Sequence, residues 1–235
     1  MKIAALSDLH GVLPKIEPCD YVFICGDISP LNIQRNIVLM KDWLVNTFCD
    51  WINNIQCKKV IIIAGNHDFC LLDIWQDEVK HNKYIIHPTG NKLKVLENNS
   101  TIIYDNSGKE YTVWGSPYCH IFGNWPFMYK DDILKNGFNT MPENCDFVLT
   151  HDAPYGCSDI ILQIPYNKMC PDHIGNKVLR DVILSKQPKI LLHGHLHSSN
   201  HDCEMLENTE VYNVSILDEY YEYTYPIKYF EINEK

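Results

Sequence analysis

The stretch KKVIIIAGNHDFC, residues Lys58–Cys70, runs from a β-branched apolar segment directly into a polar Gly-Asn-His-Asp turn. Two other stretches repeat this pattern, KIAALSDLHG at residues 2–11 and DYVFICGDIS at residues 20–29. Short continuous apolar runs that end at turn residues predict strands buried on both faces. Because each run delivers polar side chains where it ends, the three stretches predict one site assembled at the carboxyl ends of several strands.

The region between the second and third of these strands predicts a helix. We expect the strands over residues 2–7, 20–25 and 59–64. From Leu31 to Ile55 the apolar residues recur at helical spacing, which is typical of an amphipathic helix lying on a sheet. The order strand, helix, strand predicts a parallel pair of strands joined by a right-handed crossover.

The second half of the chain predicts more strands, a hairpin and another helix. STIIYDNSGKEYTVWGSP (residues 100–117) resembles two strands around an Asn-Ser-Gly turn, and Ile174–Lys186 has helical spacing. Further strands are expected within residues 146–154, 188–199, 210–220 and 225–233. With about nine strands, a few helices and no linker, we expect a single α/β domain over residues 1–235, with two mixed sheets packed together and helices outside.

Composition and charge narrow the class of protein. The chain has 235 residues, 46% of them hydrophobic, and no apolar run long enough to span a membrane, so we expect a soluble cytoplasmic protein without a membrane partner. The formal net charge of −10 argues against binding long nucleic acid, but not against a small phosphorylated ligand beside bound cations. The ten cysteines include no Cys-x-x-Cys pair and are read as thiols in a reducing compartment.

The residues at the carboxyl ends of the predicted strands form a set that can bind metal. This set contains Asp8, His10, Asp27, Asn66, His67, His151, His195 and His197. One such histidine alone is usually a satisfied core or surface residue, but here the placement repeats at five strands. Carboxylates and imidazoles suit Mn, Fe, Zn, Co and Ni. In an extended strand, residues two apart, such as Asp8 and His10, share one face and can converge on a metal cluster.

Asp27 and Asn66 have properties that a two-metal site needs. Asp27 is the carboxylate placed between the other groups in the sequence, and a bridging carboxylate is required by two cations roughly 3.5–4 Å apart. Asn66 would supply a neutral oxygen, which keeps net positive charge on the cluster for an anionic substrate. The pattern therefore favours a pair of divalent ions over a single one.

The order of these blocks resembles a known family. Asp8-x-His10, Gly26-Asp27, Gly65-Asn66-His67-Asp68, His151 and Gly194-His195-x-His197 follow one another across positions 8 to 197, nearly the whole chain. This order resembles the calcineurin-like metallophosphoesterase superfamily. The resemblance implies a four-layer αββα sandwich of two mixed sheets flanked by helices, with a two-metal site at the strand ends.

The resemblance also implies roles for individual residues. It implies a first metal ion held by Asp8, His10, Asp27 and His197, and a second held by Asp27, Asn66, His151 and His195. It implies that His67 contacts the phosphate and protonates the leaving oxygen. Two interpretations of Asp68 remain open, a carboxylate that orients His67 and a solvated loop residue. His87 and His193 are interpreted as bystanders.

A narrower resemblance concerns residues 113–129, VWGSPYCHIFGNWPFMY, together with LTHDAP at residues 149–154. These segments look like the adult-brain-239 branch of metallophosphodiesterases, whose members hydrolyse phosphodiesters, including cyclic nucleotides, usually with added manganese. The likeness implies a pocket for a base or an aromatic leaving group, lined by Tyr118, His120, Phe122, Asn124 and Trp125. The alternative is a structural aromatic corner. The chain departs from the branch at Asp68, where Glu is common, and keeps the ligand His195.

Together these observations predict a phosphoesterase that depends on two divalent ions and hydrolyses a small phosphodiester, a cyclic nucleotide being one candidate. A metal-bound hydroxide would attack, with Asp27 and His67 as catalytic residues and Asn66, His67, His120 and Trp125 at the substrate. Manganese is the ion expected to act in vitro, with Fe, Zn, Co and Ni as alternatives. A phosphomonoesterase would share every ligand, and a non-catalytic metal-binding scaffold is disfavoured because all the ligands are present. Monomer and dimer both remain open.

Overall fold

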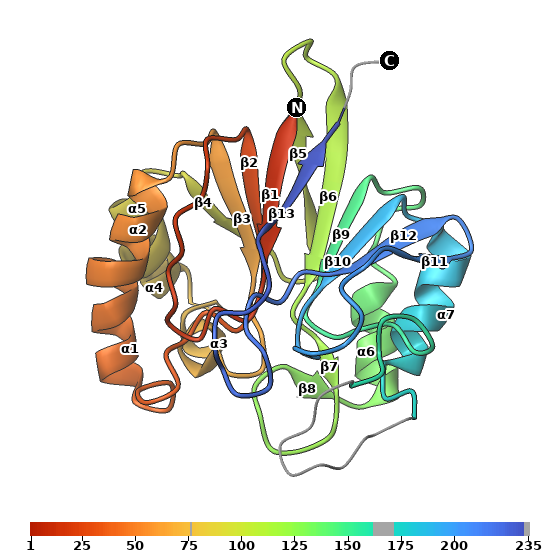
Figure 1. Ribbon diagram of the computed structural model, residues 1–235. Helices are drawn as coiled ribbons and strands as arrows, with labels where there is room; N and C mark the ends of the chain where they lie inside the picture. Colours follow the sequence, from red (N-terminus) through yellow and green to blue (C-terminus); the bar gives the residue numbers. More distant parts are fainter. Residues whose placement is uncertain (76, 162–171, 233–235) are drawn as a thin grey trace.

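The computed structural model describes residues 1–75, 77–161 and 172–232. Two β-sheets lie face to face in the middle of the molecule, and helices cover the outer face of each sheet (Figure 1). This order of layers confirms the predicted four-layer αββα sandwich of two mixed sheets. The assignment of residues 1–235 to one domain stays a prediction.

The first sheet contains the three strands that the sequence predicts near the amino terminus. Strands β1 (Lys2–Leu6), β2 (Tyr21–Cys25) and β3 (Lys59–Ile63) are parallel neighbours. β4 (Leu93–Val95) continues the parallel order beyond β3, and β13 (Lys228–Glu231) pairs antiparallel with β1. The four parallel strands therefore end at one edge of the sheet.

The second sheet has the strand order β11-β12-β10-β9-β6-β5. Its strands are β11 (Glu204–Leu206), β12 (Thr209–Asn213), β10 (Ile190–His193), β9 (Phe147–Thr150), β6 (Glu110–Ser116) and β5 (Asn99–Tyr104). β5 and β6 form the predicted antiparallel hairpin, and β6, β9, β10 and β12 run parallel. Figure 1 shows the carboxyl ends of β1–β3, β9 and β10 meeting at the lower edge of the sandwich.

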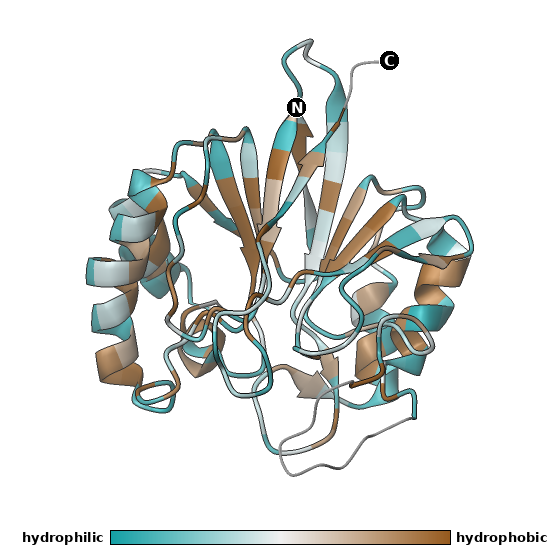
Figure 2. Ribbon diagram, viewed as in Figure 1, coloured by the Kyte–Doolittle hydropathy of each residue, from teal (hydrophilic) through white to brown (hydrophobic). Residues whose placement is uncertain are grey.

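The continuous apolar runs of the sequence reflect burial on both faces of each strand. In β2, Val22 and Ile24 pack toward the helices, whereas Phe23 packs between the two sheets. In β9, Phe147 packs between the sheets and Val148 packs toward the helices of the second sheet. Figure 2 shows the strands apolar along most of their length. A strand covered on both faces needs no alternation of polar residues, which is why the sequence reads as unbroken apolar runs.

The helices on the first sheet begin later than the sequence predicts. In place of one helix from Leu31 to Ile55, α1 (Ile37–Trp43), a π-helical turn at Leu44–Phe48 and α2 (Cys49–Asn54) follow one another. The side chain of Asn36 accepts a hydrogen bond from Leu39 N and caps α1, so residues 31–36 stay outside the helix. The other helices on this sheet are α3 (Phe69–Trp75), α4 (Glu78–His81) and α5 (His87–Thr89), with a π-helical turn at Asn82–Ile86.

Within the described ranges, the second sheet is covered by α6 (Asp131–Phe138) and α7 (Lys177–Lys186). The sequence predicts α7 from Ile174, but the side chain of Asn176 caps Leu179 N and the helix begins at Lys177. Several short strands were not predicted. Among them are β7 (Cys119–His120) and β8 (Met128–Tyr129), which form a small separate sheet. A two-residue strand has no periodicity that a sequence could reveal.

Two further features agree with the composition. The nine cysteines within the described part of the chain are all free thiols, six of them buried. Among the described residues, no helix combines the length and the apolar character needed to cross a bilayer. Residue 233, the last position of the predicted tail strand, lies outside the described residues.

Candidate metal centre

The predicted site residues lie on loops that leave the strands of both sheets at the same edge. Asp8 and His10 follow β1, and Asp27 follows β2. These two loops continue the pairing of their strands, because Asp8 N donates to Gly26 O (3.1 Å) and His10 N donates to Asp27 O (2.9 Å). The remaining members of the set follow three other strands, with Asn66 and His67 after β3, His151 after β9, and His195 and His197 after β10.

The convergence of these side chains depends on left-handed backbone rather than on extended strands. The φ angles are +55° at Asp8, +40° at His10, +52° at Asp27 and +69° at His195. The expectation that Asp8 and His10 share one face of an extended strand is therefore wrong, although the two side chains do come together. Such angles are unfavourable for residues other than glycine, and they concentrate where a function requires a particular side-chain direction.

One group of potential ligands joins Asp8, His10 and His197. Their ligand atoms all lie within 4.8 Å of one another, and all three residues are buried. His197 Nε2 is 3.3 Å from Asp8 Oδ1. The Asp8 carboxylate is held in place from the side, because Ser215 Oγ donates to Oδ2 (2.7 Å) and His195 N donates to both oxygens (3.1 Å).

A second group joins Asp8, Asp27 and His151, again with ligand atoms within 4.8 Å of one another. Asp27 Oδ2 is 3.3 Å from His151 Nε2 and 3.7 Å from His10 Nε2, so this carboxylate connects the two groups. Asn66 reaches the second group through its Oδ1, which lies 3.1 Å from His151 Nε2. His195 is placed less tightly, since its ring is 5.1 Å from that of His151.

Backbone carbonyls hold two of the imidazoles so that one ring nitrogen faces the centre. His151 Nδ1 donates to Cys25 O (2.7 Å), and His197 Nδ1 donates to Asp218 O (2.9 Å). With Nδ1 bound to a carbonyl, Nε2 is the nitrogen of each ring that faces the centre, where a cation can take the place of its proton, as in most histidine-bound metal sites. His10 has both ring nitrogens buried without a hydrogen-bond partner among the described residues. A buried imidazole in these surroundings has the properties of a metal ligand.

Burial and neighbouring charges shift the pKa values of these groups in opposite directions. Burial alone would raise the pKa of Asp27, but the neighbouring His151, His10 and His67 lower it below its ordinary value. Burial lowers the pKa of His10 and of His195 to about 4, so both rings are neutral and able to bind a cation at neutral pH. Burial acts in the same direction on His151, but the charge of Asp27 outweighs it and raises the pKa to about 10.

Two glycines allow the loops to approach one another. A Cβ atom at Gly65 would collide with the Asp27 side chain, and a Cβ atom at Gly194 would collide with Ser7 and Asp8. The backbone at Gly65 is not left-handed, so glycine is needed there for the close approach of the Asp27 loop.

His67 lies beside the candidate ligands with one ring nitrogen toward them. Its Nε2 is 3.9 Å from Asp27 Oδ2, and its Nδ1 is 2.5 Å from Gln34 Oε1. The indole of Trp125 lies against the ring at a centroid distance of 4.5 Å. Among the described residues, His67 belongs to neither of the two ligand groups, and its role at the substrate stays a prediction.

Neither interpretation of Asp68 agrees with the structure. The carboxylate is fully buried, and within the described part of the chain the hydrogen-bond partner of the His67 ring is Gln34. It accepts hydrogen bonds from Gly65 N (2.8 Å), Ser29 N (3.0 Å) and Ser29 Oγ (2.7 Å) and thereby ties the turn after β3 to the loop after β2. Burial raises its pKa to about 6.

The residues expected to line an aromatic pocket lie in different surroundings. Tyr118 packs against Tyr129 at 4.4 Å as part of the core, which matches the structural alternative. Phe122 is half exposed and lies 5.0 Å from the His195 ring, at the entrance of the centre. His120 is oriented by Asp152, whose Oδ2 is 2.7 Å from His120 Nδ1, and this hydrogen bond raises the pKa of His120.

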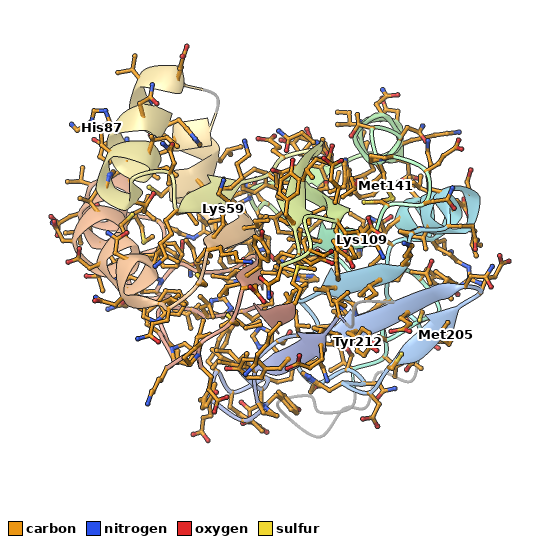
Figure 3. The ribbon with its side chains drawn as sticks, turned by 90° about the horizontal axis from the view of Figure 1, so that it is seen from above. Lys59, His87, Lys109, Met141, Met205 and Tyr212 are labelled. Atoms are coloured by element: carbon orange, nitrogen blue, oxygen red, sulfur yellow. The ribbon has the colours of Figure 1, made fainter. Side chains whose placement is uncertain are left out.

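The two histidines interpreted as bystanders lie in different surroundings. His87 begins α5 and is exposed, and Figure 3 shows it on the outer side of the helical layer. His193 is fully buried, with Nδ1 3.0 Å from Gly194 O. Neither belongs to the two ligand groups found among the described residues.

Sequence reasoning missed Tyr221 and Gln34. The Tyr221 ring lies edge-on 4.9 Å from His10 and 5.3 Å from His197. Gln34 belongs to a segment that was expected to be helical, and Tyr221 lies in the loop that connects β12 to β13. No motif marks either residue, so only the fold could have identified them.

Comparisons with known proteins agree with this geometry. The family model described as calcineurin-like phosphoesterase matches residues 1–199. The human protein "Metallophosphoesterase domain-containing protein 1" is 25% identical over 209 residues, which cover 83% of this chain and 60% of the relative. A "Probable rhamnogalacturonate lyase C" of Emericella nidulans is also 25% identical, over 84% of this chain but only 17% of the relative. The chain thus spans less than two thirds of the length of these curated relatives.

A solved structure supports the fold. The crystal structure of phosphopantetheinyl hydrolase (PptH) from Mycobacterium tuberculosis superposes with a TM-score of 0.53 at 14% identity. The match covers 92% of this chain and 89% of the other. At this identity the likeness concerns the fold alone.

Proposed function

The chain belongs to the calcineurin-like phosphoesterase family, and we propose that it is a metal-dependent enzyme that hydrolyses a small phosphodiester. One observation supports the metal dependence above all others. Carboxylates and imidazoles from both sheets converge within 4.8 Å, while His10 keeps two buried ring nitrogens without a partner among the described residues. No structural role explains that arrangement as well as a pair of cations does.

We assign the ligands as the family resemblance implies. Asp8, His10, Asp27 and His197 would hold one ion, and Asp27, Asn66, His151 and His195 would hold the other. When bound, two divalent ions withdraw charge from the phosphate oxygens and lower the pKa of water toward neutrality. Asp27 has the position that a shared ligand needs, because its Oδ2 is within 3.9 Å of three imidazoles.

His67 would act on the leaving group of the substrate. As an imidazolium, His67 would donate Nδ1–H to Gln34 Oε1 and direct Nε2–H toward the side of Asp27. Transfer of the Nε2 proton to the leaving oxygen returns a neutral ring that still donates Nδ1–H to Gln34. Burial lowers the pKa of His67, which makes the imidazolium a stronger acid.

The aromatic rings around the centre favour a diester over a monoester. Phe122 lies against His195, Trp125 against His67, and Tyr221 against His10. Ile121 and Tyr220 add exposed apolar surface in the same two loops. A phosphodiester carries a second esterified group that such rings can contact, whereas a phosphomonoester presents only charged oxygens on that side.

The test compares hydrolysis of bis(p-nitrophenyl) phosphate and p-nitrophenyl phosphate by metal-stripped protein refilled with manganese. We expect the diester to have the higher kcat/KM. Preference for the monoester would contradict the diester proposal and favour a phosphatase with the same metal centre. Turnover of neither compound, by protein that has taken up manganese, would favour the binding-scaffold alternative.

A further inference from the structure

Residues 31–38, which run from the loop after β2 into the first turn of α1, surround a hollow of about 530 Å³. Of its lining residues, the proposed mechanism uses Gln34 alone. The polar side chains of this lining are those of Asn32, Gln34, Asn36 and Arg35. In a chain with 30 acidic and 20 basic residues, these eight positions include no carboxylate. The hollow is therefore a place where an anionic group meets hydrogen-bond donors without like-charge repulsion.

This hollow adjoins the candidate metal centre through two side chains. Gln34 Oε1 is 2.5 Å from His67 Nδ1. The guanidinium of Arg35 lies 4.6 Å from the centroid of the Trp125 ring, and the His67 ring lies 4.5 Å from the same indole. Gln34 and Trp125 therefore each connect the lining of the hollow to His67.

Arg35 is held by aromatic rings and not by acids. Its guanidinium also lies 4.5 Å from the centroid of the Phe69 ring, so two ring faces fix its position. Within the described part of the chain, no carboxylate forms an ion pair with Arg35. The lysines of the same region differ, since Lys41 and Lys80 both pair with Asp73. Contacts with ring faces leave the planar N–H donors of a guanidinium free for an anion.

We propose that this hollow is a subsite for a second phosphate group of the substrate, recognised by Arg35. The inference rests on the proposed function and deepens it, because it specifies a diester in which one ester arm carries a further phosphate. A guanidinium binds phosphate through two parallel hydrogen bonds. Asn32 offers a carboxamide beside it, whereas Gln34 and Asn36 are already engaged with His67 and with Leu39 N.

The kinetic test uses two substrates that differ by one phosphate. These are the p-nitrophenyl ester of thymidine 5′-phosphate and the same compound bearing a 3′-phosphate. We expect the manganese-loaded protein to prefer the 3′-phosphorylated ester by about 10- to 100-fold in kcat/KM. The preference should vanish in Arg35→Gln and persist in part in Arg35→Lys, with thermal melting to show that both variants fold.

Lys109→Gln is the matched control. Lys109 is an exposed cation resting on the Tyr111 ring at 5.2 Å, in the turn between β5 and β6. That turn lies at the opposite end of the sandwich from the candidate centre (Figure 1). The control loses the same charge, so we expect it to keep the preference. An equal loss in both variants would mean that only net charge matters and would overturn the subsite.

A binding measurement separates this inference from the proposed function. Calorimetry with the full chain, with and without manganese, compares thymidine 3′,5′-bisphosphate with thymidine 5′-phosphate. We expect the bisphosphate to bind about tenfold more tightly, and the two to bind equally to Arg35→Gln. If neither ester is hydrolysed, the proposed function falls while this ratio still decides the subsite. If both are hydrolysed equally and the ratio is near one, the subsite falls and the proposed function stands.

Discussion

Three imidazoles of the candidate centre have Nδ1 held by an acceptor oxygen and Nε2 on the side of the ligand groups. For His151 and His197 the acceptor is a backbone carbonyl, and for His67 it is Oε1 of Gln34. An oxygen that only accepts keeps a proton on Nδ1. Nε2 is then the atom that would bind a cation in the two proposed ligands, and the atom that would carry the transferred proton in the proposed acid.

Asp27→Ala should abolish activity, because it removes the carboxylate that lies between the two ligand groups. We expect kcat on the diester to fall by at least about a thousandfold, together with loss of bound manganese. The rate and the metal content of the purified variant are measured side by side. Near-normal turnover in this variant would contradict the two-metal assignment.

His67→Ala should separate catalysis from metal binding. We expect normal manganese content with kcat reduced by about 100- to 10,000-fold, because the ring is assigned to the substrate and not to the metal ligands. His87→Ala is the control, since that histidine is exposed on α5 and should leave both quantities unchanged. Loss of metal from the His67 variant would show that its role has been misassigned.

At the scale of the elements, the centre depends on how closely the loops after the strands approach each other. The loop after β10 passes so near the loop after β1 that Gly194 has no room for a side chain. The buried carboxylate of Asp68 ties the loops after β2 and β3 together in a similar way. These contacts position the ligands more strictly than the strands alone would.

Gly194→Ala should therefore weaken metal binding by displacing Asp8. We expect at least about a tenfold rise in the manganese dissociation constant, and a loss of about 1–3 kcal/mol in the free energy of unfolding. Gly90→Ala serves as a control, because its φ is +55° but no atom lies within 4 Å of the added Cβ. That variant should lose stability without losing metal affinity. Equal manganese affinity in both variants would contradict the proposed role of close approach.

Glu97 should make stability depend on pH. Burial raises its pKa from 4.5 to about 7, so the folded state binds its proton more tightly than the unfolded state does. This stabilisation is complete below pH 4.5 and is lost as the pH rises through about 7. Glu97→Gln should thus be more stable than the wild type at pH 8.5, by about 1 kcal/mol after allowance for solvent screening, and about equal at pH 4.5. Urea unfolding measures both, and a difference that does not change with pH would contradict the assignment.

For the whole molecule, the sheets and the set of candidate ligands could be predicted, because both appear in the sequence as local patterns of residues. The apolar runs of β1–β3, β9 and β10 reveal buried strands, and the residues after them reveal the candidate ligands. The start of α1 could not be predicted. The apolar residue Ile33 fits the helical spacing, but the side chain of Asn36 caps the helix, which therefore begins only at Ile37. Tyr221 and Arg35 could not be predicted either, since they reach the centre through contacts between distant segments.

Each of the two sheets supplies part of the candidate ligand set, which explains why this fold supports such a centre. The first sheet supplies Asp8, His10, Asp27 and Asn66, and the second sheet supplies His151, His195 and His197. Ions bound between them would connect the sheets at the edge where the strands end.

Counting the manganese ions bound at saturation by the full chain after metal stripping tests the two-metal centre most directly. Inductively coupled plasma mass spectrometry after equilibrium dialysis gives the number per chain. We expect two ions per chain, because the side chains at the ends of β1, β2, β3, β9 and β10 form two adjoining groups. A single ion, or none, would contradict the two-metal centre on which the proposed function depends.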